Sequence, residues 1–385
     1  MKVLLVAAYY YPHMGGVENY TAHLAESLVA EGHDVTVLTS KLSKEDPYEE
    51  RDEVGYRIVR LPSRHFVNQR YPLLQKGSET RRFEEEFAAG SFDGVVINTR
   101  YYPISLFAAA QARAYGVPCL VVDHSSSYLT MGQPAVDVVI KAYEQLVTAF
   151  LKRKVSNYYA VSQDGVTWLK TFGIQARGVL NNAVDADAFL ACASSRDFRS
   201  ELGLGGDCVV TFTGRLISEK GVWTCLQVAK CLDGEGFSFV MAGEGPEFDK
   251  LQSEAPSNFH LVGRLDAPDV AALLVQSDVF LFPSMYPEGF PSSLLEAAAV
   301  GCCLITTPIG GSRDLIPDER YGIVLKRSSS SEEICEVLRD VKRGLFASCG
   351  DCASARVREQ FTWRSTADAV IAALTSVSQE GVQDY

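Results

Sequence analysis

Short apolar runs alternate with amphipathic segments along almost the whole chain. In the first half, the apolar runs lie at residues 3–10, 34–39, 56–62, 94–99, 118–124 and 158–162. Between the first two runs, residues 17–31 carry apolar side chains at helical spacing, and Gly32 follows where a helix would end. Continuous apolar runs are typical of strands that are buried on both faces of a parallel sheet. The first half therefore predicts a parallel sheet covered by helices.

The alternation stops at residues 181–207, which are rich in turn formers, and then begins again. The apolar runs of the second half lie at residues 208–216, 237–245, 258–265, 279–284, 303–308 and 321–325. This pattern predicts an α/β protein with two Rossmann-like, doubly wound parallel-sheet domains, over residues 1–185 and 186–361, with 181–207 as the linker. We expect the last helix, about 362–377, to pack back on the first domain. Two such sheets that face each other across a cleft would bind ligands at the carboxyl ends of their strands.

Length and composition fit this organisation. The chain has 385 residues, of which 47% are hydrophobic and 22% charged, as in a folded protein of two domains. Its net charge of −12 disfavours nucleic acid as a partner. No apolar run approaches the ~20 residues of a membrane-spanning helix, and the ten cysteines show no disulfide framework. We therefore expect a reducing, cytoplasmic environment.

Two local features leave more than one interpretation open. Residues 60–82 combine several Arg and Lys side chains with apolar ones, which favours either docking on an anionic membrane or an ordinary solvated loop and helix. Cys349 and Cys352 form a CGDC pair. A redox role needs such a pair at the start of a helix after a strand, and the sequence instead places it after a polar helix.

In the first half, two strand ends carry candidate site residues. Gly15 and Gly16 precede the first helix, where backbone can approach a phosphate and free N–H groups point toward it. This is not a GxGxxG pattern, which disfavours a nicotinamide or flavin cofactor. His124 follows the run 118–124 and is either a site residue or a histidine that bonds local backbone. Its neighbour Asp123 would point to the opposite face of the strand, so we expect no contact between them.

In the second half, cations and glutamates gather at strand ends. Arg215 and Lys220 lie in one loop between glycines and could neutralise a diphosphate. Glu288 and Glu296 flank a Gly/Pro loop and the start of a helix, where Ser292 is expected to be the N-cap and free N–H groups could hold a phosphate. Both carboxylates could accept hydrogen bonds from hydroxyl groups.

Taken together, these motifs resemble a known family. GGVE at 15–18, His124, GRLISEKG at 214–221, GEGP at 243–246, the Glu-x7-Glu element from Glu288 to Glu296, and TTPIGG at 306–311 occur in the order found in retaining glycosyltransferases of the GT-B architecture, in the family-four group. The chain departs from the usual pattern at Pro291, where a small residue is common, and at NNAVD in the linker. Neither departure touches the cations or the glutamates.

The resemblance implies a role for each matching position. The implied catalytic residues are His124, Arg215, Lys220 and Glu288. The implied donor-binding residues are Gly15, Gly16, Gly243, Arg264, Leu265, Phe290, Pro291, Ser292, Ser293, Leu294 and Glu296. Within these sets, Glu288 would bind hydroxyls of the donor sugar, Glu296 the ribose, and Arg264 or Leu265 the base. His124 would face the donor sugar and the acceptor.

The resemblance also implies that a hexose-type sugar moves from a UDP- or GDP-linked donor with retention of configuration, and that no metal or other cofactor takes part. Asp185 and Asp187 form a DxD string that holds a metal in other glycosyltransferases, but here it lies in the linker and is interpreted as chance. The acceptor is left open between a lipid-linked, polysaccharide or small-molecule one. The alternatives are a nucleotide-sugar epimerase of the same fold and a non-catalytic sugar-nucleotide-binding partner.

Overall fold

The computed structural model describes residues 1–13, 15–66, 71–130 and 132–383. The chain forms two compact units, one made of residues 1–182 and 363–385 and the other of residues 183–362. The first unit therefore holds both ends of the chain, and the second is inserted between them. The sequence placed the boundary after residue 185.

The first unit is built on one mixed sheet. Its strands follow the order β10 (Gly178–Val179), β9 (Tyr158–Ala160), β8 (Cys119–Asp123), β7 (Gly94–Asn98), β1 (Lys2–Ala7), β2 (Asp34–Ser40), β4 (Arg57–Leu61) and β3 (Glu49–Arg51). All neighbours pair in parallel except β3, which is antiparallel to β4. The helices of this unit are α1 (Gly16–Ala30), α2 (Ser78–Ala88), α3 (Pro103–Ala114), α4 (Pro134–Lys152), α5 (Gln163–Leu169), a short 3-10 helix η1 (Lys170–Phe172) and α15 (Trp363–Gln383).

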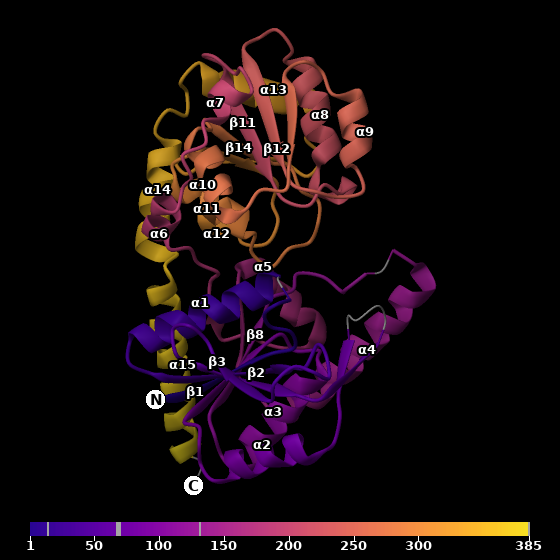
Figure 1. The fold of residues 1–385 in the computed structure, drawn as a ribbon, viewed down its shortest axis with the longest axis vertical. Coiled ribbons are helices and arrows are strands. Elements are labelled where there is room, and N and C mark those ends of the chain that lie inside the picture. The colour runs from indigo at the N-terminus through magenta and orange to yellow at the C-terminus, as the bar shows by residue number, and fades with distance from the viewer. Residues whose placement is uncertain (14, 67–70, 131, 384–385) are drawn as a thin grey trace. The chain divides into compact units, whose positions relative to one another are not determined.

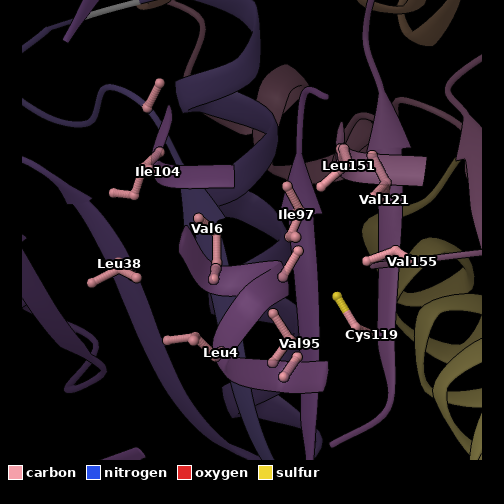
Figure 2. Packing of buried hydrophobic residues seen from close by; sticks show 14 of the residues in the cluster. Leu4, Val6, Leu38, Val95, Ile97, Ile104, Cys119, Val121, Leu151 and Val155 are labelled. Atoms are coloured by element: carbon pink, nitrogen blue, oxygen red, sulfur yellow. The ribbon is translucent and has the colours of Figure 1, made fainter. Parts of the chain in front are cut away.

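The core of the first unit lies between this sheet and its helices. Leu4 and Val6 on β1, Val95 on β7 and Val121 on β8 are fully buried and belong to one cluster, part of which Figure 2 shows. On the same unit, α15 packs against α1, and the rings of Trp363 and Tyr20 lie 5.5 Å apart. The continuous apolar runs thus become strands covered on both faces.

The second unit has a fully parallel sheet of six strands. They follow the order β13 (Phe259–Gly263), β12 (Phe237–Ala242), β11 (Cys208–Thr213), β14 (Val279–Phe282), β15 (Cys303–Thr306) and β16 (Ile323–Val324). Its helices are α6 (Ala186–Ala191), α7 (Phe198–Glu201), the 3-10 helix η2 (Ser218–Lys220), α8 (Val222–Cys231), α9 (Phe248–Glu254), α10 (Ala267–Val275), α11 (Ser292–Ala299), α12 (Ser312–Leu315), α13 (Ser331–Lys342) and α14 (Cys349–Gln360). Figure 1 labels most of these elements. The predicted α/β class with two Rossmann-like domains is confirmed.

The passage between the two units lies at residues 182–183, within the segment 181–207, but the rest of this segment belongs to the second unit. It forms α6 and α7, which are capped by the side chains of Asp185 and Asp197. Phe198 is fully buried and belongs to a core cluster of the second unit. The segment was misread because its helices are short and its few apolar residues are widely spaced.

The structure adds detail to two further local predictions. Residues 60–82 are more than a loop and a helix, because β5 (Ser63–Phe66) and β6 (Tyr71–Leu74) form an antiparallel hairpin before α2. Residues 67–70 of that stretch lie outside the described residues. The CGDC pair follows the polar helix α13, as predicted, and Cys349 is the first residue of α14, where its Sγ lies 2.7 Å from that of Cys303 on β15.

No helix within the described ranges is both long and apolar enough to cross a bilayer.

Candidate functional site

The loops at the carboxyl edge of the second sheet touch one another through glycines. Gly243, after β12, has a φ of 151°, and a Cβ there would lie 1.8 Å from the carbonyl oxygen of Gly214. A Cβ at Gly245 would lie 2.2 Å from the carbonyl oxygen of Leu216. The loop after β12 can therefore pack on the loop after β11 only because neither position carries a side chain.

Close contacts at glycines also join the loops after β11, β14 and β15. Gly221 has a φ of 77°, and its Cβ would lie 2.2 Å from the carbonyl oxygen of Pro283. A Cβ at Gly310 would lie 2.7 Å from the carbonyl oxygen of Glu288. The loops that carry Arg215, Lys220 and Glu288 are thus held in direct backbone contact.

Lys220 and Glu288 form an ion pair at this edge. Lys220 Nζ lies 3.0 Å from Glu288 Oε1, and the two side chains are only 16% and 17% exposed. Nζ also lies 5.4 Å from the centre of the Phe282 ring, on β14. The structure therefore brings together a cation and a carboxylate that are 68 positions apart in the sequence. Partial burial makes their interaction stronger than that of an exposed pair.

Arg215 lies in the same loop as Lys220 but in a different environment. Its side chain is exposed and has no hydrogen-bond or ion-pair partner among the residues that the structure describes. A guanidinium group with five free donors is suited to a bidentate contact with phosphate oxygens.

Helix α11 offers its N-terminus at the end of the β14 loop. Its N-cap is Pro291, which has no side chain able to cap, and Ser292 is the first helical residue rather than the predicted cap. Within the described chain, no acceptor is bonded to the backbone N–H of Ser292 or Ser293. Ser292 is exposed and Ser293 half-buried. An unsatisfied helix N-terminus of this kind attracts anions.

Three of the expected donor-binding residues have buried side chains. Phe290 is 7% exposed and lies beneath Gly311, where a Cβ would meet its ring at 2.0 Å. Pro291 and Leu294 are buried as well. These side chains support the loop from inside. Glu296 is half-buried in the second turn of α11.

The end of β13 carries the residues expected beside a base. The Arg264 side chain is exposed, whereas Leu265 is half-buried against the core cluster around Phe198. The backbone N–H of Gly243 donates to the carbonyl oxygen of Gly263, 2.7 Å away, which ties this strand end to the β12 loop.

In the first unit, the two glycines before α1 differ in their surroundings. A Cβ at Gly15 would meet the Glu18 carboxylate at 2.4 Å, whereas a Cβ at Gly16 would meet nothing within 4 Å. Gly15 thus makes room for the buried Glu18, whose pKa is raised by burial and lowered in part by His13. Gly16 borders open space at the first turn of α1.

His124 follows β8 and is bonded to a buried side chain. Its Nε2 lies 3.2 Å from Asn98 Oδ1, at the end of β7. The Asn98 amide nitrogen donates to Thr21 Oγ1, and that hydroxyl donates to the carbonyl oxygen of Val17. Because the Thr21 hydrogen is used on Val17, Thr21 can only accept from Asn98.

This chain of hydrogen bonds determines the protonation of the His124 ring. Asn98 must present its oxygen to His124, so Nε2 carries the hydrogen. Burial lowers the pKa of His124 to about 3, which keeps the ring neutral at physiological pH. Nδ1 then carries a lone pair that no residue of the described chain uses. It is also not one of the fully buried polar atoms of the described chain. His124 can accept a hydrogen bond there, as from a hydroxyl, but cannot donate one.

The Asp123 carboxylate accepts hydrogen bonds from the backbone N–H groups of His124 and Ser125 rather than from the His124 ring, and it belongs to a fully buried charge cluster. Arg100 Nη1 lies 2.7 Å from Asp123 Oδ2, and Arg100 Nη2 lies 3.0 Å from Glu144 Oε2 on α4. Burial raises the pKa of both carboxyls, and the Arg100 charge lowers them. The sequence reasoning missed Asn98, Thr21 and this cluster, although an Arg directly after the apolar run 94–99 was a visible signal.

Replacing Asn98 by Asp is expected to raise the pKa of His124, because a carboxylate next to Nε2 stabilises the protonated ring. In nitrogen-15 NMR spectra of the wild type from pH 5 to 8, His124 should remain neutral with hydrogen on Nε2. In Asn98→Asp the ring should titrate within that range. The variant His124→Gln identifies which ring nitrogen signals belong to His124. A wild-type ring that titrates near the ordinary histidine pKa of about 6.5 would contradict the effect of burial.

Comparison with known proteins decides the family. A model described as "Glycosyltransferase Family 4" matches residues 14–188, and one described as "Glycosyl transferases group 1" matches residues 194–344. The chain belongs to the GT-B glycosyltransferases. This confirms the resemblance of the sequence motifs to GT-B glycosyltransferases.

Individual relatives of this glycosyltransferase agree with that assignment. It is 27% identical to the "GDP-mannose-dependent alpha-mannosyltransferase" of Mycolicibacterium smegmatis, over 84% of each chain. It is also 27% identical to the "Glycogen synthase" of Mycobacterium tuberculosis, over 84% of this chain and 82% of that protein. Its fold resembles the structure of Anabaena Alr3699/HepE in complex with UDP, with a TM-score of 0.75, 16% identity, and coverage of 98% and 100%.

Proposed function

We propose that this glycosyltransferase moves a hexose-type sugar from a UDP- or GDP-linked donor to an acceptor hydroxyl, with retention of configuration. The observation that carries the proposal is the largely buried Lys220–Glu288 pair, held by interlocked loops, together with the free guanidinium of Arg215 in the same loop as Lys220. Relatives support the donor class, since one is named for GDP-mannose and the Anabaena protein was crystallised with UDP and with UDP-glucose.

The proposed roles follow from charge. Cleavage of the donor leaves negative charge on the departing diphosphate, and preorganised cations and N–H groups lower the barrier to that step. Lys220 and Arg215 would supply the positive charge, and the N–H groups of Ser292 and Ser293 would add hydrogen bonds. Glu288, held by Lys220, would accept hydrogen bonds from hydroxyls of the donor sugar, and Glu296 from the ribose.

The remaining donor contacts are proposed from accessibility. Arg264 and the half-buried Leu265 would contact the base, and the Gly243 turn would bring backbone close to the donor. In the first unit, Gly16 would bind phosphate through its backbone, and the His124 lone pair would accept a hydrogen bond from a sugar hydroxyl.

We propose that the reaction needs no metal ion and no protein nucleophile, with the leaving phosphate taking the acceptor proton. The DxD string supports this, because Asp185 caps α6 and Asp187 pairs with Arg358. Within the described ranges, no three His, Cys, Asp or Glu side chains are grouped as metal ligands. A chelator is expected to leave turnover unchanged, and activity lost to the chelator and restored by a divalent ion would refute this part of the proposal.

Nucleotide titration tests the proposal directly. Calorimetric titration should detect binding of UDP or GDP and none of NAD⁺, and the preferred nucleotide sugar should then be hydrolysed slowly without any acceptor. Release of sugar would separate a transferase from a non-catalytic partner, and conversion to a second nucleotide sugar would instead indicate an epimerase. The acceptor is a lipid-linked, polysaccharide or small-molecule one, and a cytoplasmic location belongs to the same proposal.

Gly16→Ala gives a sharper test of the first unit. A Cβ there meets nothing within 4 Å, so the variant should fold and melt like the wild type. If the donor phosphate lies against Gly16, however, the methyl group should weaken the binding of the donor. Matched binding and melting curves would show this, and unchanged donor affinity in a folded variant would remove Gly16 from the donor contacts.

A further inference from the structure

Helix α4 carries a row of apolar side chains that face solvent. Val138, Val139, Leu146 and Phe150 are 68%, 67%, 57% and 46% exposed. Ala135, Ala142 and Ala149, also exposed, continue the row at helical spacing. From residue 135 to 150 the row is about 22 Å long, at 1.5 Å per residue. We call these seven residues the α4 stripe.

The opposite side of α4 is already occupied. It buries Ile140, Val147 and Leu151 against the first unit, and Glu144 is bonded to the buried Arg100. Figure 1 shows α4 at the edge of this unit, with its N-terminal turns extending away from the sheet. Single exposed apolar residues are ordinary on a protein surface, but a contiguous row on one helix marks an interaction site.

The charges around the stripe are positive. The exposed charged residues of α4 are Lys141 and Lys152, followed directly by the exposed Arg153, and the Lys152 ammonium donates a hydrogen bond to the carbonyl oxygen of Phe172. Apart from the buried Glu144, the acid of α4 is Asp137, which is half-buried and accepts a hydrogen bond from Thr130. This local excess of cations contrasts with the net charge of −12 of the whole chain.

The β5–β6 hairpin continues this surface. Tyr71 on β6 and Tyr143 on α4 place their ring centres 5.4 Å apart. Arg64 and Leu73 are cross-strand partners in the hairpin, and both are exposed. Within the basic stretch 60–82, by contrast, Arg60 is buried and paired with Glu50, and Arg82 is paired with Glu49.

An apolar row bordered by cations fits an anionic lipid surface. A helix of this kind lies in the membrane plane with its apolar side among the acyl chains and its cations at the headgroups. A second copy of the chain fits less well. A twofold interface would bring the two α4 stripes together and place their cations close to one another. We propose that the α4 stripe, with the edge of the β5–β6 hairpin, docks this protein on anionic membranes.

Vesicle flotation of the full-length protein tests this docking. The wild type should float with vesicles of phosphatidylcholine and phosphatidylglycerol, less with phosphatidylcholine alone, and less at high salt. Leu146→Glu should lower the apparent affinity at least about tenfold, because it removes one buried leucine and adds repulsion. Lys141→Gln combined with Arg153→Gln should abolish the preference for the anionic vesicles.

Leu345→Glu is the matched control. Leu345 lies in the second unit, is 65% exposed, and undergoes the same change of size and charge. It should float like the wild type. Val139→Glu gives a second stripe variant if Leu146→Glu folds poorly, and melting curves compare the folds. None of these measurements needs the donor or transfer.

Three results would overturn the proposal. One is a wild type that stays with the soluble fraction at all lipid compositions. Another is equal loss of flotation in Leu345→Glu and Leu146→Glu. The third is a dimer, seen by sedimentation velocity, that Leu146→Glu dissociates while vesicles bind neither protein, because the stripe would then be a contact between copies.

Discussion

Lys220→Ala should lower the turnover of the donor by about 10²–10³-fold, which is the usual effect of removing one group that stabilises developing negative charge. Lys220 Nζ is paired with Glu288, and its side chain is mostly shielded from water, so its charge acts strongly at this site and Arg215 would replace it only in part. Its loss would leave charge on the departing diphosphate unbalanced. Glu288 would also lose the partner that orients it. The measurement is the initial rate of donor hydrolysis at saturating nucleotide sugar.

The fold of this variant should be retained. Lys220 is the last residue of η2, and the interlocked glycines that hold its loop are unchanged. Lys230→Ala is the control, because Lys230 lies on the following helix, α8, and forms only an exposed pair with Glu254. Near-normal turnover of Lys220→Ala, with both variants melting like the wild type, would rule out the diphosphate role of Lys220.

Gly243→Ala should destabilise the second unit by ~3 kcal/mol or more, because a side chain at positive φ is strained by about 1–3 kcal/mol before any clash is counted. The clash is severe here, since the methyl group would lie 1.8 Å from the carbonyl oxygen of Gly214. At roughly 2–4 °C per kcal/mol for a unit of this size, Tm should fall by about 6–12 °C. The loop that carries Arg215 should also shift, so nucleotide affinity should fall with stability.

Gly206→Ala distinguishes this effect from the general cost of replacing a glycine. Gly206 lies in the same unit, has nothing within 4 Å of its Cβ position, and has no positive φ. We expect little change in Tm for that variant. Equal Tm values for the two variants would show that the β12 loop adjusts its backbone, and that the glycine contact is dispensable.

The sheets were predictable because their strands are buried on both faces. Such strands leave continuous apolar runs, and all twelve runs marked in the sequence correspond to strands of the two sheets. The short edge strands β3 and β10 and the β5–β6 hairpin were not predicted, since their pattern is mixed. The helices within 181–207 were missed for a related reason, because single buried residues such as Phe198 leave no periodic pattern.

The site residues could be predicted where their chemistry follows from residue type and from a fixed spacing within one loop. Lys220 and Glu288 could be placed at the same edge because each follows a strand of one parallel sheet, but their ion pair was not predicted. Burial could not be foreseen at Phe290 and Leu294, since a motif does not show which of its side chains face inward. Asn98 and Thr21 were missed because their role depends on a contact across 77 positions of sequence.

The return of α15 to the first unit has a consequence for biosynthesis. Chains are made from the N-terminus, and N-terminal domains usually complete their folding first. Here the order is reversed, because residues 183–362 are all available once residue 362 has left the ribosome, whereas the first unit still lacks α15. Until then, the face of α1 that receives Trp363 is uncovered. A ribosome that stalls before α15 has emerged would therefore expose an unfinished first unit next to a completed insert in the same chain.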